Sequence, residues 1–218
     1  MSEIGTKTKE RGPRWRRRKE ARPAEILDAA LSTFTAKGFA GTRLDDVAAL
    51  AGISKGTLYL YFADKTGLFE AVVHERLRGR ILAAIDTDED LPSLAALQLV
   101  LGRLARLIAD PRLSAIPKLI ISESGNFPDL AKFYMREVIK PVRDRLAALI
   151  AKGIARGELM PVKPDIVAKL IIAPVLLAAL WRHTFAPFDS LRLDPAELLA
   201  EHLGILERGL SSAQTRLP

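Results

Sequence analysis

Side chains suited to contacting a nucleic acid are concentrated between residues 54 and 65. Hydroxyl groups and amines donate hydrogen bonds to phosphate oxygens and to base edges in a groove. Leu58 and Phe62 lie four residues apart among them, which places both on one side of a helix. A short helix with one buried face and one outward face is therefore expected. The outward set comprises Ser54, Lys55, Gly56, Thr57, Tyr59, Tyr61 and Lys65.

Two short helices joined by a tight turn must position this set. Thr42 is expected to cap the first helix, and Asp45 completes a capping-box pattern. Gly52 ends that helix because glycine adopts a positive φ without a Cβ clash. Ser54 then caps the second helix, which we expect over residues 55–62. The inward face of the first helix comprises Leu44, Val47, Ala48 and Ala51.

A helix as short as residues 55–62 is not stable alone, so neighbouring helices must hold it. This arrangement is typical of a helix-turn-helix, whose second helix enters a DNA major groove. An ordinary helical hairpin with two surface tyrosines would have the same spacing. Spacing alone therefore leaves both alternatives open.

The residues themselves favour the helix-turn-helix. The run Ala48-x-x-Ala51-Gly-Ile-Ser-Lys-Gly-Thr-Leu-Tyr-x-Tyr-Phe-x-x-Lys65-x-x-Leu68 resembles the DNA-binding domain of the TetR/AcrR family of bacterial transcriptional regulators. The upstream pattern Phe34-x-x-x-Gly-Phe-x-x-Thr42 is similar to the first helix of that family and its exit. The resemblance covers about residues 22–77, and it departs from the family at Thr66, where many members carry glutamate.

The resemblance implies a division of labour among the outward side chains. Thr57 and Tyr59 are expected at base edges, and Lys55 at bases or phosphates. Asp64 is expected to cap a long helix that runs to about Ile85. The resemblance implies that this helix links the unit to the rest of the chain and that its tilt sets the separation of two such units in a dimer. Phosphate contacts are expected from Thr42, Ser54, Tyr61 and Lys65.

Composition indicates an all-α protein of 218 residues, 49% of them hydrophobic, because no stretch alternates with period two between hairpin turns. We expect an N-terminal three-helix helix-turn-helix DNA-binding domain (22–85) followed by a larger helical ligand-binding and dimerisation domain (91–212). The acidic stretch 86–90 separates them. The absence of cysteine excludes disulfides and thiolate metal sites and fits a cytoplasmic protein.

The net charge of +7 is unevenly distributed. Residues 1–20 contain eight Lys or Arg and three Glu, so they carry +5 of it. We expect residues 1–21 to form a basic, disordered arm in which Arg16, Arg17 and Arg18 contact DNA phosphates. A merely solvated tail is the alternative. No apolar segment follows the arginines, so the arm is not a secretory signal.

The C-terminal half contains further helical segments, expected at about 94–109, 118–123, 128–156, 164–184 and 195–210. Twelve apolar residues, 170–181, are too few to span a bilayer. A helix that is apolar all round must be covered on every side. We therefore expect helices 164–184 and 195–210 to form a two-fold, four-helix interface between two copies of the chain, with no membrane partner.

A ligand pocket is suggested by Pro117, Pro141 and Pro174, which kink helices and open gaps between them. The scarcity of charge there favours an apolar or amphipathic effector, with Glu123 or an arginine as a polar contact. Each candidate could equally be ordinary core. The candidate lining residues are Leu104, Ile108, Ile120, Glu123, Phe127, Phe133, Tyr134, Trp181 and Phe185.

Motifs of the common enzyme classes are missing, since the sequence has no G-x-S-x-G, P-loop, G-x-G-x-x-G or H-E-x-x-H. We therefore expect no enzyme and no cofactor. The expected function is a ligand-responsive repressor that binds a palindromic operator as a dimer and releases it when an effector binds. A DNA-binding protein without an effector, either architectural or an activator, is the alternative.

Overall fold

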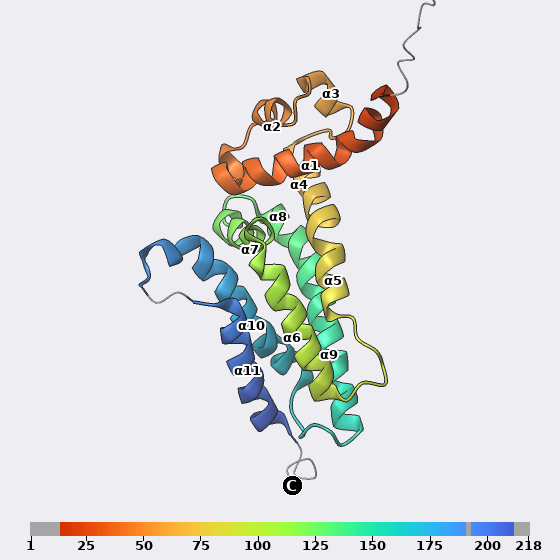
Figure 1. Ribbon diagram of the computed structural model, residues 1–218, viewed down its shortest axis with the longest axis vertical. Coiled ribbons are helices and arrows are strands. Elements are labelled where there is room, and N and C mark those ends of the chain that lie inside the picture. Colours follow the sequence, from red (N-terminus) through yellow and green to blue (C-terminus); the bar gives the residue numbers. More distant parts are fainter. Residues whose placement is uncertain (1–13, 191–192, 212–218) are drawn as a thin grey trace, which may run out of the picture.

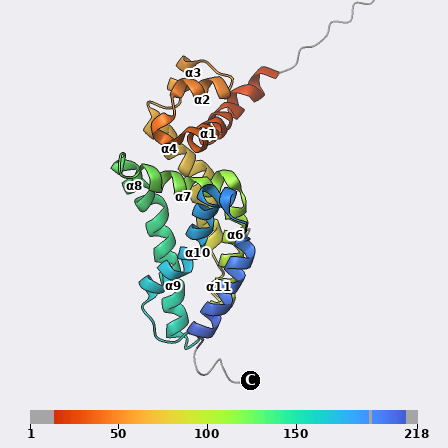
Figure 2. The same cartoon turned by 90° about the vertical axis from the view of Figure 1, so that its left-hand side faces the viewer.

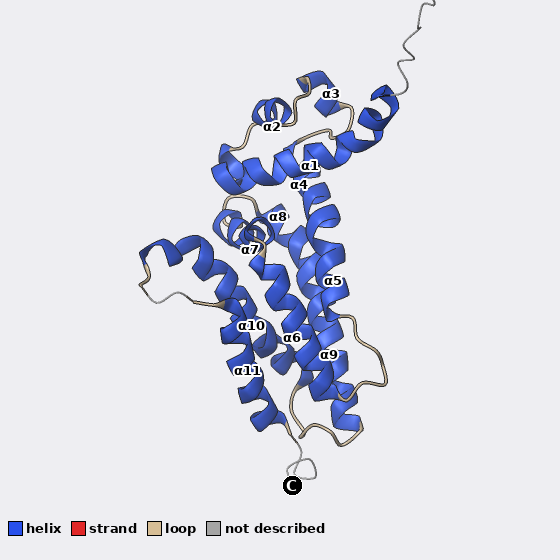
Figure 3. Cartoon of the chain, viewed as in Figure 1, coloured by secondary structure: helices blue, strands red, loops and turns tan. Residues whose placement is uncertain are grey.

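The computed structural model describes residues 14–190 and 193–211. Within these ranges the regular elements are helices, and the only bridge between extended segments is an isolated pair, Leu159 and Ser211 (Figure 3). The all-α prediction is therefore confirmed.

The N-terminal unit consists of four helices, with α1 as the floor on which α2 and α3 lie (Figure 1). Ser54 caps α3 by accepting a hydrogen bond from the N–H of Thr57 at 3.1 Å, and Asp64 caps α4 by accepting one from Gly67 at 2.8 Å. Both predicted caps are confirmed. The four helices are α1 (Arg14–Gly41), α2 (Leu44–Leu50), α3 (Lys55–Tyr59) and α4 (Lys65–Val72).

Two predictions about the beginning of this unit are wrong. Helix α1 begins at Arg14 and carries Pro23 inside it, so residues 14–21 belong to a helix and not to a disordered arm; residues 1–13 lie outside the described ranges. The N-cap of α2 is Arg43, and no side chain caps that helix. The side chain of Thr42 is instead buried and donates a hydrogen bond to the carbonyl of Gly38.

Gly38 divides α1 into two helical pieces. Its φ of 74° and ψ of 171° are not helical, and the chain resumes a helical turn from Phe39 to Gly41. A positive φ of this kind favours glycine, which has no Cβ to clash with the backbone. The predicted stop at Gly38 is thus a break followed by one more turn.

A link helix connects the N-terminal unit to the remainder of the chain. It runs through α4, a π-helical turn η1 (Val73–Arg78) and α5 (Gly79–Ile85), as a continuous rod (Figure 1). The predicted end at Ile85 is confirmed, while the π turn was not expected. Such turns often occur at functional sites.

The C-terminal bundle lies below the N-terminal unit, with α7 directly beneath α1 and the long helices running away from it (Figures 1 and 2). Pro117 lies inside a single helix, so the predicted start of this helix at residue 118 is wrong. Pro141 lies in the first turn of α9, after a π-helical turn and at the predicted place of a kink. The elements are α6 (Ser93–Ala109), α7 (Pro111–Glu123), α8 (Pro128–Tyr134), η2 (Met135–Ile139), α9 (Lys140–Ala155), α10 (Pro164–Thr184), η3 (Ala186–Phe188) and α11 (Pro195–Leu210).

The hydrophobic core forms two clusters, and the boundary between them does not coincide with the boundary between the N-terminal unit and the C-terminal bundle. One cluster contains α1–α4 together with η1 and the inner faces of α7, α8 and η2, and a second joins α5, α6, α9, α10 and α11. Phe39 of α1, for example, packs edge-on against Phe127, with ring centroids 4.8 Å apart. The N-terminal unit therefore shares its core with the near end of the C-terminal bundle.

Helix α10 is long and apolar enough, by length and composition alone, to cross a membrane. Core helices of soluble proteins meet the same criterion, and α10 packs against α6, α7, α9 and α11. Its buried residues include Ala168, Ile171 and Ala178.

Close packing at Gly153 provides a test of the bundle. A Cβ at this buried position would lie 2.6 Å from a methyl carbon of Leu159, so Gly153→Ala should destabilise the protein by roughly 1–3 kcal/mol. At Gly102, exposed within α6, a Cβ would meet nothing within 4 Å, so Gly102→Ala should stabilise by about 0.5–1 kcal/mol. Thermal unfolding of both variants measures this, and equal midpoints for the two would contradict the packing described.

Candidate nucleic-acid interface and internal cavity

Helix α3 presents an outward surface because one residue anchors it. Leu58 is fully buried, while Tyr59, Leu60 and Tyr61 are 47%, 84% and 39% exposed. The hydroxyls of Ser54 and Thr57 lie 2.8 Å apart at the start of the helix. The predicted two-faced helix is therefore present, although it ends at Tyr59 and not at residue 62.

Lys55 is held by an acidic neighbour in the free protein. Its Nζ lies 2.8 Å from a carboxylate oxygen of Asp45 on α2, and this hydrogen-bonded pair raises the pKa of Lys55. A DNA phosphate that approaches Lys55 must therefore compete with Asp45. Lys37 and Asp46 form a similar pair at 2.8 Å, so the lysines nearest α2 are partly neutralised.

Thr42 is not on the surface. It is 2% exposed, and its hydroxyl donates a hydrogen bond to the carbonyl of Gly38 at 2.6 Å. The structure thus gives Thr42 a place inside the fold in place of the predicted phosphate contact. Gly56 is exposed, and Arg16, Arg17 and Arg18 lie on the first turns of α1.

Lys65 also has partners within the protein. Its ammonium group donates to the carbonyls of Phe39, Ala40 and Thr42 at 2.7, 3.2 and 3.2 Å, and lies 4.6 Å from the ring centroid of Phe39. An ammonium group has three donors, and all three are used. In this structure Lys65 therefore joins α4 to the end of α1, and its ammonium group has no donor left for the predicted phosphate contact.

Two surface residues were missed by sequence reasoning. Leu60 follows α3 and is the most exposed apolar residue of this unit, and apolar side chains contact thymine methyl groups in major grooves. Arg43, at the N-terminus of α2, is exposed and forms no ion pair within the described ranges. The spacing of apolar residues leaves both Leu60 and Arg43 off the buried faces of their helices, and this was the sequence signal that could have identified them as surface residues.

A cavity of about 410 Å³ lies in the C-terminal bundle. It is lined by residues of η1, α5, α6, α7, α8, η2, α9 and α10, and most of them are apolar. Four predicted residues line it, namely Leu104, Ile108, Ile120 and Tyr134. Its polar groups come from Ser114, Tyr134, Arg143 and Lys169. Burial raises the pKa of Tyr134, so that hydroxyl stays protonated.

Five predicted lining residues lie elsewhere. Phe127 packs on Phe39, Phe133 is buried beside His74, and Glu123 contacts the backbone of α1. Trp181 donates to Asp189 at 3.0 Å, and Phe185 packs against Trp181 with 53% of its surface exposed. Lining residues on the link helix and on α10 were missed because both helices were assigned other roles; examples are Leu77, Ile81, Ile172 and Val175.

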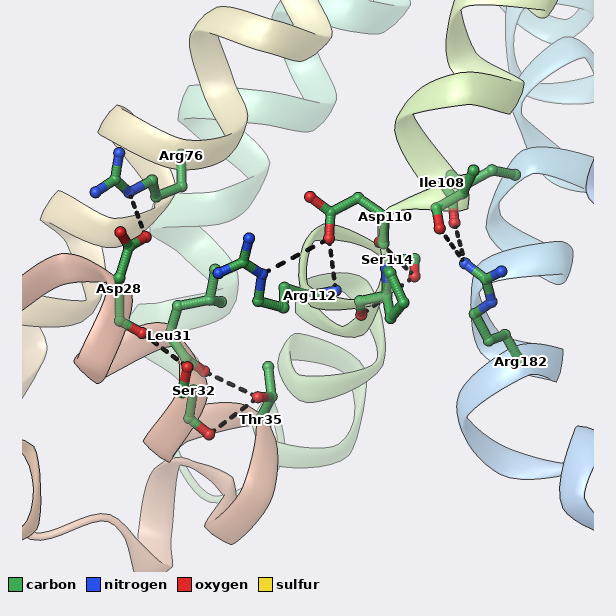
Figure 4. Close-up of polar contacts among 12 residues, drawn as sticks. Asp28, Leu31, Ser32, Thr35, Arg76, Ile108, Asp110, Arg112, Ser114 and Arg182 are labelled. Carbon is green, nitrogen blue, oxygen red and sulfur yellow. Dashed lines mark hydrogen bonds and ion pairs between the residues drawn. The ribbon is translucent and has the colours of Figure 1, made fainter. Parts of the chain in front are cut away.

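Polar contacts fix the corner between α6 and α7 beside the cavity (Figure 4). Arg182 of α10 donates to the carbonyls of Ile108 and Ala109 at 2.7 and 2.8 Å, and Asp110 accepts from the N–H of Arg112 at 2.9 Å. Ser114 lies 2.9 Å from Nε2 of His183, whose pKa is lowered by burial and then by neighbouring cations. Within the described ranges, no three His, Asp or Glu side chains are grouped as a metal site requires.

Comparison with known proteins identifies this architecture. Residues 26–72 match the model of the bacterial regulatory proteins of the tetR family, and residues 89–194 match the tetracyclin repressor-like C-terminal domain. The HTH-type transcriptional regulator RutR of Escherichia coli is 34% identical over 155 residues, which cover 66% of this chain and 68% of RutR. The chain belongs to the TetR family. It is a DNA-binding transcriptional regulator, and regulators of this family respond to effectors and typically act as dimers.

Other TetR-family proteins show the same fold. The fatty acid metabolism regulator protein of Bacillus subtilis is 27% identical over 146 residues, covering 65% of this chain and 73% of its own. The crystal structure of FadR from Bacillus subtilis in complex with stearoyl-CoA has a TM-score of 0.71 at 22% identity, covering 84% of this chain and 96% of that one. The ketosteroid regulator KstR2 of Mycobacterium tuberculosis has a TM-score of 0.64 at 22% identity, covering 88% and 95%.

The salt dependence of operator binding tests the role of Lys65. Because its ammonium group is held by carbonyls, Lys65→Met should lower affinity without changing the slope of log K against log salt. Lys55→Met should reduce that slope by about 0.9, as expected for one lost phosphate contact. Fluorescence titrations at four salt concentrations on a duplex obtained by in vitro selection give both slopes. A reduced slope for Lys65→Met would restore its phosphate role.

Proposed function

We propose that this regulator is a cytoplasmic repressor that binds a palindromic operator as a homodimer and releases it when an apolar or amphipathic effector enters the cavity. The observation that carries this proposal is the position of the cavity, since Leu77 and Ile81 of the link helix form part of its wall. A ligand there would touch the rod that carries the N-terminal unit. Tilting that rod changes the separation of two DNA-reading helices and biases the dimer away from DNA.

Side-chain roles at the operator follow from the exposed surface. Thr57 and Tyr59 are proposed at base edges, with Leu60 beside them, while Ser54 and Tyr61 are proposed at phosphates. Lys55 is proposed at either. Arg16, Arg17 and Arg18 are proposed at phosphates from the start of α1, and Arg43 joins them.

An exposed apolar stripe on α10 supports the proposed dimer. Ile166, Leu170 and Leu177 are 48%, 56% and 49% exposed and follow one another at helical spacing. Ile205 on the adjacent α11 is 59% exposed. A second copy related by a two-fold axis would cover both helices, and it would place two DNA-reading helices on one side of the duplex.

The cavity wall favours an amphipathic effector with an acyl-like chain. The walls are apolar, and Lys169 contributes a cationic side chain suited to an anionic head group, while the second cation, Arg143, is paired with Asp144 at 2.7 Å. The similarity to a fatty acid metabolism regulator and to FadR, which was solved with stearoyl-CoA, supports the same class of compound. Stearate and stearoyl-CoA are therefore suitable probes.

Disrupting the α10 stripe should weaken operator binding through the dimer. Leu170→Arg places a charge in the proposed interface, so the protein should become monomeric and lose at least tenfold in operator affinity. Leu99→Arg, at an exposed apolar position of α6, should remain dimeric. Sedimentation velocity and DNA titration measure the two effects. A Leu170→Arg protein that stays dimeric would exclude this interface.

Stearoyl-CoA should release the regulator from its selected operator. Val175→Phe fills the cavity and should weaken stearoyl-CoA binding about tenfold or more, while Leu99→Phe should bind it as the wild type does. Fluorescence anisotropy of labelled operator reports release, and calorimetry reports binding. Selective DNA binding that neither stearate nor stearoyl-CoA affects would contradict the acyl-type effector.

A further inference from the structure

A carboxylate from the C-terminal bundle is bound to the backbone of the N-terminal unit. Oε1 of Glu123, the last residue of α7, accepts hydrogen bonds from the N–H groups of Phe39 at 2.8 Å and Ala40 at 3.2 Å. These residues lie 84 and 83 positions away in the sequence. The N–H groups at the start of a helical segment have no partner within it, and the break at Gly38 exposes such a start. Glu123 therefore caps a helical turn of the other unit.

A cation holds the same turn from the opposite end. Lys65 donates to the carbonyls of Phe39, Ala40 and Thr42, while Glu123 accepts from the N–H groups of Phe39 and Ala40. The negative group thus meets the positive ends of the peptide dipoles, and the positive group meets the negative ends. Hydrogen bonds to charged groups are stronger than neutral ones. This turn, residues 39–42, is here called the clamped turn.

Gly38 permits the close approach of the carboxylate. A Cβ at Gly38 would lie 2.8 Å from Oε1 of Glu123. Its positive φ also turns the following N–H groups toward α7. Gly38 therefore both produces the break in α1 and leaves the space that the carboxylate of Glu123 occupies.

Helix α7 connects the cavity wall to the clamped turn. Ser114, Pro117, Ile120 and Ile121 of α7 line the cavity, and Ile120 is one helical turn before Glu123. A displacement of α7 by an occupant therefore moves the carboxylate. The clamped turn leads directly into α2 at Leu44, and α2 positions α3.

The N-terminal unit is consequently held by the link helix, by the hydrophobic core that α1 shares with α7 and α8, and by the clamped turn. Apolar packing has no fixed direction, whereas hydrogen bonds do, so the clamped turn adds a directional restraint on rotation of the unit about the link helix. We propose that Glu123 is a positioning residue for DNA binding: it sets the orientation of α3 relative to the dimer and transmits occupancy of the cavity through α7. This inference rests on the proposed function as a dimeric, ligand-responsive regulator.

The test compares three duplexes: a palindrome selected with the wild-type protein, the same palindrome with one base pair inserted between its half-sites, and a single half-site. Glu123→Ala should lose about tenfold in affinity for the palindrome, the scale of charged hydrogen bonds. It should discriminate less between the two spacings and bind the half-site as the wild type does. Glu123→Gln should lie between, because an amide oxygen still accepts N–H bonds without the charge.

Asp129→Asn is the matched control. Asp129 is an exposed carboxylate near the same end of the bundle and is paired with Lys132 on its own helix, so its variant should match the wild type on all three duplexes. Equal losses of Glu123→Ala on palindrome and half-site would show that Glu123 only supports the fold of the N-terminal unit. Unchanged spacing preference would also overturn the inference while leaving the proposed function intact. A wild-type protein that binds no selected duplex would overturn both.

Discussion

The clamped turn is the contact on which the relation between the two halves of this regulator depends. Its peptide groups have few alternatives: the break at Gly38 frees N–H groups, and the end of α1 frees carbonyls. Phe39 is buried, so its N–H and carbonyl need partners from the protein, whereas Ala40 is exposed to solvent. Glu123 and Lys65 supply these partners from α7 and α4, and Phe39 belongs to the hydrophobic cluster shared by α1, α4, α7 and α8.

The two π-helical turns, η1 and η2, lie beside the cavity and are joined to each other. Turn η1 interrupts the link helix and η2 precedes α9, and residues of both line the cavity, among them Leu77 and Val138. Arg78 of η1 donates to the carbonyl of Glu137 in η2 at 3.2 Å, so the two turns are joined. A helix with an extra residue in one turn has weaker hydrogen-bond geometry there. The cavity is therefore bordered by the π-helical turns of the link helix and of the segment between α8 and α9.

Much of the fold could be predicted from the sequence because it is determined locally. The caps at Ser54 and Asp64, the stop at Gly52 and the final helix from Pro195 each depend on a few adjacent residues, and each is present. The partners of individual polar side chains could not be predicted. Lys65 and Glu123 were assigned to phosphate and effector because both are charged, yet their partners lie 23 to 26 and 83 to 84 residues away. Only the fold brings those carbonyls and N–H groups within reach. Only four of the nine predicted residues line the cavity, because its wall comes from helices that are distant in the sequence.

The distribution of charge suggests how affinity and specificity are separated in this protein. Near α2 and α3, Lys55 and Lys37 are paired with Asp45 and Asp46, and Lys65 is held by carbonyls. Among the charged residues of the surface proposed to meet base edges, Arg43 is therefore the one left without an ion pair within the described ranges. The excess of Lys and Arg lies in residues 1–20, and its last part is on a helix continuous with the floor of the N-terminal unit. Binding that depends on phosphates and salt would then come mainly from the beginning of α1, while Thr57, Tyr59 and Leu60 discriminate among sequences. An effector that rotates α3 would abolish discrimination and leave the charge in place, so release from the operator need not mean release from DNA.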